Sequence, residues 1–162
     1  MSLRHFLVAS SLILSPVAVI GVQSTAFAES ANDSINISGN VPASVTITST
    51  AADAATSLPL STAGTQTVKI ADITVTTNFG GAILTATSTN NGVLLNSNNP
   101  NDNLQYQLDI VGDGGQAGNF SNIGSFSRTV QGELDLYIQV NNPAVPKKGS
   151  YNDTITLTVS DQ

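Results

Sequence analysis

Apolar and polar residues alternate with a period of two along most of the chain after residue 33. The clearest run, residues 104–110, places Leu, Tyr, Leu and Ile at every second position, with Gln and Asp between them. Such alternation indicates a β-strand with one face on a core and the other on solvent. Similar runs, some short and mixed, occupy residues 34–41, 45–48, 68–70, 73–79, 83–86, 93–95, 134–140 and 154–159.

The segments between these runs carry turn residues. Asn91-Gly92, residues 112–115, residues 141–143 and Lys148-Gly149 are typical of turns. Only residues 51–55 suggest helix, and there only a single turn. We therefore predict an all-β fold, an antiparallel β-sandwich of about seven to eight strands, with a small barrel as the alternative.

The first 28 residues have the features of a cleaved signal peptide. Arg4 precedes an apolar stretch over residues 6–22, and Ala26-Phe27-Ala28 provides a small-x-small cleavage pattern. A transmembrane anchor is the alternative, but serines and Pro16 interrupt the apolar stretch. The predicted domains are a signal peptide (1–28), an N-terminal extended segment (29–41) and a β-sandwich domain (42–162). We expect an exported product, in the periplasm, at the cell surface or outside the cell, with no membrane span after cleavage.

Composition narrows the functions that this product can have. The chain of 162 residues has no cysteine, and 11 acidic residues stand against five basic ones. A disulfide framework and thiol chemistry are therefore excluded, and the acidic balance argues against nucleic-acid binding. Removal of residues 1–28 also removes His5, the one histidine. Without His or Cys, the common nucleophile–base pairs are missing, and we expect no enzyme and no cofactor.

The remaining candidates for chemistry are weak. The carboxylates on predicted strands are Asp109 on one strand and Glu133 and Asp135 on another. Asp109 and Asp135 occupy the polar side of these strands, where a solvated face is the simplest interpretation. The loop of residues 98–103 and the loop around Asp113 are candidates for calcium binding. Turn formation is the favoured explanation of both loops, because neither has the spacing of a known calcium loop.

The two ends of the exported chain carry the strongest functional signal. Residues 154–159 form a strong predicted strand whose open edge needs cover. The run of residues 34–41 can provide that cover, either within its own chain or as a strand added to the next subunit. Strand addition between copies is a head-to-tail contact that does not close, and it produces a filament.

A family resemblance fits this arrangement. Gly149-Ser150-Tyr151, followed by a short polar step and the alternating run to Val159, resembles the closing strand of bacterial fimbrial subunits and of spore coat protein U-type domains. Residues 35–45 resemble the donor-strand and first-strand region of cysteine-free alpha-type pilins. The disulfide usual in spore coat U-type domains and in the commonest pilins is absent here, which favours the alpha-type comparison or a stand-alone relative.

The resemblance implies an incomplete Ig-like sandwich that the N-terminal strand of a neighbouring copy completes. It also implies a periplasmic chaperone and an outer-membrane usher as partners, besides the homopolymer. The residues that would insert into the neighbour are Ile35, Ile37, Gly39 and Val41.

Two functions thus remain open. One is a non-enzymatic structural subunit of a surface filament or coat. The other is a stand-alone exported β-sandwich that binds a glycan, an ion or a surface protein. For glycan binding the exported chain offers few aromatic platforms, of which Tyr137 is the most notable because it lies on the polar side of its strand.

Overall fold

The computed structural model describes residues 33–142 and 144–161. The predicted signal peptide and residues 29–32 lie outside the described residues. Residues 33–39 and the domain that begins at Asn40 are separate units, and we describe each by itself. Residues 33–44 belong to no strand or helix.

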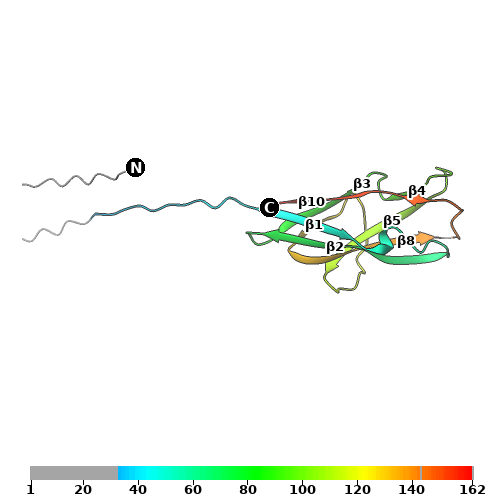
Figure 1. Cartoon of the computed structure of the whole chain (residues 1–162), viewed down its shortest axis with the longest axis horizontal. Coiled ribbons are helices and arrows are strands. Elements are labelled where there is room, and N and C mark those ends of the chain that lie inside the picture. The colour runs from blue at the N-terminus through cyan, green and yellow to red at the C-terminus, as the bar shows by residue number, and fades with distance from the viewer. Residues whose placement is uncertain (1–32, 143, 162) are drawn as a thin grey trace, which may run out of the picture. The chain divides into compact units, whose positions relative to one another are not determined.

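The domain consists of two antiparallel sheets (Figure 1). The larger sheet has the order β1 (Val45–Ala51), β2 (Gly64–Thr77), β8 (Gly132–Asn142), β5 (Asn103–Gly112), β4 (Val93–Asn96) and β9 (Tyr151–Asn152), with β6 (Ser121–Asn122) paired to β5. The smaller sheet has the order β10 (Ile155–Ser160), β3 (Ala82–Ser88) and β7 (Ser127–Val130). The described residues contain no α-helix, only the 3-10 turn η1 (Asp53–Ala55). The predicted all-β fold is confirmed.

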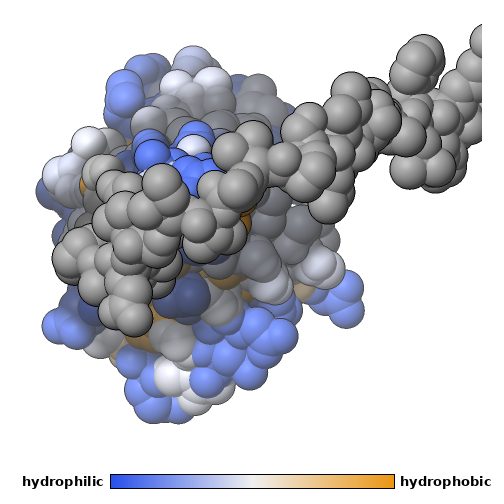
Figure 2. Space-filling view, turned by 90° about the vertical axis from the view of Figure 1, so that its left-hand side faces the viewer, coloured by the Kyte–Doolittle hydropathy of each residue, from blue (hydrophilic) through white to orange (hydrophobic). Residues whose placement is uncertain are grey.

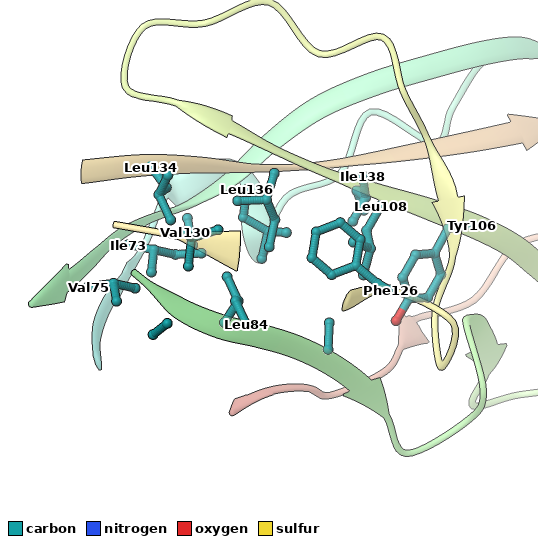
Figure 3. Close-up of a cluster of buried hydrophobic side chains, with 14 of the residues drawn as sticks. Ile73, Val75, Leu84, Tyr106, Leu108, Phe126, Val130, Leu134, Leu136 and Ile138 are labelled. Carbon is teal, nitrogen blue, oxygen red and sulfur yellow. The ribbon is translucent and has the colours of Figure 1, made fainter. Parts of the chain in front are cut away.

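One apolar core lies between the two sheets. Leu84 of β3 is fully buried, and it faces residues of the larger sheet that include Ile73 and Leu136 (Figure 3). Viewed from one end, the domain presents mainly hydrophilic residues, and apolar ones show only in recesses between them (Figure 2). Burial of these alternating side chains is the main stabilising contribution available to a chain without cysteine.

The long strand β2 unites two runs that the sequence pattern separates. Apolar residues occupy even positions at Val68 and Ile70, and odd positions from Ala71 onward. The pairing of β2 with β8 shifts register between Lys69 and Ala71. This bulge inserts one extra residue, so that apolar residues face the core on both sides of it.

The connection from β3 to β4 contains the expected turn. Asn91 and Gly92 both adopt positive φ, 55° and 79°. These two residues favour that conformation, and here the turn carries the chain from the smaller sheet to the larger one. No helix within residues 33–142 or 144–161 has the length and apolarity that a membrane crossing requires.

The carboxylate of Asp153 ties the two sheets together near the start of β10. Its Oδ2 accepts hydrogen bonds from Ser88 Oγ of β3 and from Tyr106 OH of β5, both at 2.7 Å. Its Oδ1 accepts from the backbone N–H groups of Asn90 (3.1 Å) and Thr154 (2.7 Å). Burial and the bond to Asp153 raise the pKa of the Tyr106 phenol, so this hydroxyl remains a donor.

We predict that Asp153→Ala lowers the free energy of unfolding by about 2–4 kcal/mol. The substitution leaves the buried Tyr106 hydroxyl and the two backbone N–H groups without their acceptor. Denaturant unfolding of the exported form measures this loss. Tyr106→Phe removes one of the four bonds and should cost about 1 kcal/mol. Equal losses in the two variants would contradict the role of Asp153 as the shared acceptor.

Candidate functional site

Two strand edges on the same side of the domain are left unpaired. β1 pairs only with β2, and β10 pairs only with β3 among the described strands. The two strands lie alongside each other, with Cα atoms within 8 Å (Figure 1). An edge strand presents unpaired N–H and C=O groups that can pair with a further strand. Here two such edges, one from each sheet, lie next to each other.

A groove of about 390 Å³ runs along these two strands. Its apolar lining comes from both sheets, and Leu136 of β8 lies at its floor beside residues of β1, β2 and β10. The other apolar side chains that line it are Ile47, Ala51, Ala55, Ile70, Ala71, Ile155 and Leu157. The groove therefore opens onto the core itself.

The apolar residues of β1 and β10 are less covered than those of the central strands. Ile155, Leu157 and Val159 of β10 are only half-buried, as are Val45 and Ile47 of β1. By contrast, the four core residues of β8 are at most 8% exposed. The core is thus incomplete along this side.

The predicted inserting residues of the N-terminal segment belong to no sheet. Ile35, Ile37 and Val41 are 84, 94 and 83% exposed, and they are three of the five large apolar residues that the described part of the chain exposes. Gly39 is also exposed and has open space around it. An exposed apolar face of this kind is a candidate interaction surface.

The side-chain amide of Asn78 holds the connection between this segment and β1. Its Oδ1 accepts from Ser44 N (2.8 Å) and its Nδ2 donates to Pro42 O (2.9 Å), while Asn78 N donates to Ser44 O (3.2 Å). The amide thereby continues the β1–β2 ladder past its last pair, Val45 and Thr77. Pro42 has no backbone N–H, and it takes part in this contact through its carbonyl oxygen.

Asp109 and Asp135 are not on a solvated face, and that expectation is wrong. Each is 1% exposed, because the loop between β5 and β6 covers them. Gly118 N and Asn119 N both donate to Asp109 Oδ2 at 2.9 Å, and Gly114 N donates to Asp135 Oδ2 at 3.0 Å. The two carboxylates therefore hold a loop in place, and neither is accessible to a substrate.

Lys69 forms ion pairs within a cluster of carboxylates around Asp135. The carboxylate oxygens of Asp72, Asp113 and Asp135 lie within 4.8 Å of one another, as in a metal site. However, Lys69 Nζ lies 2.7 Å from both Asp72 Oδ1 and Asp135 Oδ1. A cation would have to displace this ammonium, so we describe the cluster as an ion-pair network.

Burial acts to raise the pKa of Asp135, but the bonds from Lys69 and Gly114 outweigh it and hold this pKa below its usual value. The pKa of Lys69 is raised by its bonds to Asp135 and Asp72. Both shifts favour the charged forms in the folded state.

Other residues singled out in the sequence have structural partners. Asp102 pairs with Lys147 Nζ at 2.7 Å and accepts from Asn99 Nδ2 at 2.8 Å, so the loop of residues 98–103 closes upon itself. Tyr137 is half-buried and its hydroxyl donates to Gly115 O at 3.4 Å.

Asn78 was not predicted from the sequence, where it is only one polar residue after a strand. Its partner Pro42 lies 36 positions away.

We predict that Asp135 makes the domain sensitive to acid. Its carboxylate has a lower pKa in the folded than in the unfolded chain, so the stabilisation is present above the unfolded value, near 3.8, and is lost as the pH falls through the folded one. The difference in unfolding free energy between the wild type and Asp135→Asn should therefore shrink from about pH 5 to about pH 2. Asp161→Asn makes the same charge change at an exposed side chain and is the control. A difference independent of pH would contradict this assignment.

No protein-family model matches the chain, and no curated protein is significantly similar to it.

Proposed function

We propose that the protein is an exported, non-enzymatic structural subunit of a surface filament or coat, and that residues 35–41 of one copy insert into the groove between β1 and β10 of the next. The observation that carries this proposal is the groove itself, which combines two unpaired strand edges with an apolar floor. The exposed alternation of Ile35, Ile37 and Val41 supplies a matching occupant.

The donor segment and the two strand edges agree in length. Seven extended residues span about 20–23 Å, as do the six or seven residues of β10 and β1. An inserted strand can pair its backbone with one or both edges, while the residues at every second position face the core. Burial of two isoleucines and a valine contributes about 5–8 kcal/mol, which is comparable with the cost of association.

The finer fold that we propose is an incomplete Ig-like sandwich, which the insertion completes. Because donor and acceptor are different surfaces of one chain, the contact is head-to-tail and repeats without closing. A groove that opens onto the core is an aggregation hazard before assembly. A periplasmic chaperone and an outer-membrane usher, as in the families that the sequence resembles, would meet that need.

Donation between copies, rather than within one, is favoured by Asn78. Pairing residues 35–41 beside the β1 of the same chain requires a reversal within residues 42–44. The three hydrogen bonds of Asn78 hold this connection along the direction of β1. A reversal would break at least the bonds to Pro42 O and Ser44 N.

We predict that Ile37→Asp abolishes assembly of the exported form (residues 29–162), because it places a carboxylate on the inserting face. Asn36→Asp adds the same charge one position away, on the opposite face, and should leave assembly within a few-fold of the wild type. Sedimentation velocity over a concentration series measures both. If the two variants assemble alike, the alternation does not insert, and donor-strand assembly is lost as an explanation.

We also predict that Asn78→Ala shifts assembly toward self-paired monomers. Loss of bonds worth about 1–2 kcal/mol corresponds to about a 5- to 30-fold change in the ratio of monomer to polymer after refolding. Ser44→Ala is the matched control, because Ser44 contributes only its backbone to these bonds. A ratio that is unchanged in Asn78→Ala would remove the argument for donation between copies and leave the groove itself untouched.

A further inference from the structure

A second hollow lies on the outer face of the larger sheet, away from the groove. It measures about 670 Å³ and extends over β4, β5, β6 and β8. None of its lining side chains is charged, although the chain has 16 charged residues. Amides predominate among them: Asn91, Asn103, Gln105, Gln107, Asn122, Gln139 and Asn141. The hollow shares no residue with the groove between β1 and β10.

The floor of this hollow includes a polar row set by strand register. The row consists of Thr67, Gln139, Gln107 and Asn122, which are successive cross-strand neighbours on β2, β8, β5 and β6. All of them except Thr67 line the hollow. Neighbours of this kind lie about 5 Å apart. Two positions along, the same face brings Asn141 of β8 and Gln105 of β5 into the hollow.

Hydrogen bonds within the row fix how its amides are oriented. Gln107 Nε2 donates to Asn122 Oδ1 (3.0 Å), and Gln139 Nε2 donates to Thr67 Oγ1 (3.3 Å). The other polar atoms of these side-chain amides have no hydrogen bond to another described residue. They are Gln107 Oε1, Asn122 Nδ2 and Gln139 Oε1. The row thus presents acceptors and a donor side by side, a pattern that the adjacent hydroxyls of a sugar can match.

The hollow also has an apolar side. Val93, Leu104 and Ile123 line it and are half-buried, and the latter two also pack against the core. An apolar surface next to amides suits the two sides of a pyranose ring, which carries C–H groups on its faces and hydroxyls at its rim. Charged sugars find no counter-charge here, and the acidic chain repels anionic ones.

We infer that this hollow binds a neutral oligosaccharide. Tyr106, the aromatic residue among those that line the hollow, is only 4% exposed and offers no face for a sugar to stack on. One site is therefore weak, with a dissociation constant on the order of 1 mM. Repetition of the site along an assembly can raise the overall avidity by about 10²–10⁴. The inference does not depend on the proposed assembly, since the hollow is present in a single copy.

The test uses the labelled exported form on an array of neutral and anionic oligosaccharides, followed by calorimetric titration with any neutral oligosaccharide that binds. We expect binding to neutral oligosaccharides only, and at least a tenfold loss in Gln107→Ala/Gln139→Ala. Gln131→Ala, an exposed amide outside the hollow, is the matched control and should bind as the wild type does. Thermal unfolding checks that the variants are folded.

Three results would overturn the inference. They are the absence of binding to any neutral oligosaccharide on the array and in titrations up to about 20 mM, a preference for anionic ones, or binding that survives the double substitution. The Ile37→Asp variant separates this test from that of assembly. In titration it should keep the affinity per site even where assembly is lost, and a loss of that affinity would place the sugar elsewhere than in this hollow.

Discussion

The structure depends on one constraint: two sheets share an apolar core, but no described strand joins them along the side of β1 and β10. A chain without cysteine cannot bridge that side with a disulfide, so cover must come from strand pairing or from side chains. The side chains of β10 provide only part of it, since Ile155, Leu157 and Val159 stay half-exposed. The groove leaves part of the core uncovered, and the N-terminal segment leaves its apolar side chains exposed. The insertion that we propose would bury both.

Buried carboxylates hold other parts of the domain together. Asp153 links β3 to β5 through Ser88 and Tyr106, and Asp109 and Asp135 hold the β5–β6 loop through its backbone N–H groups. Three of the eleven acidic residues are thus used as internal acceptors, where a carboxylate satisfies several donors at once.

The turn at Asn91-Gly92 was predictable because both residues favour positive φ. The alternation of apolar residues predicted β1 to β5, β8 and β10, but it also marked residues 34–41, which form no strand, and it missed the short strands β6, β7 and β9. It could not predict which strands share a sheet, so it did not show that β1 and β10 would border the same groove. It also failed for Asp109 and Asp135, because a strand pattern identifies the outer face of a sheet but not the loop that covers it. The clamp at Asn78 depends on a contact between residues 36 positions apart, which no local pattern contains.

The positions of the two surfaces bear on what an assembled subunit can do. The groove uses the edges β1 and β10, whereas the amide row begins on β2 and is centred on β8 and β5, facing outward from the larger sheet. A strand inserted at the edge pairs through backbone groups and directs its apolar side chains into the core, so it does not cover the outer face. Assembly through one surface therefore leaves the other open in every copy. The weak site for an uncharged ligand that we infer is of little use in one molecule, and it would become effective if the proposed filament repeats it at a fixed spacing.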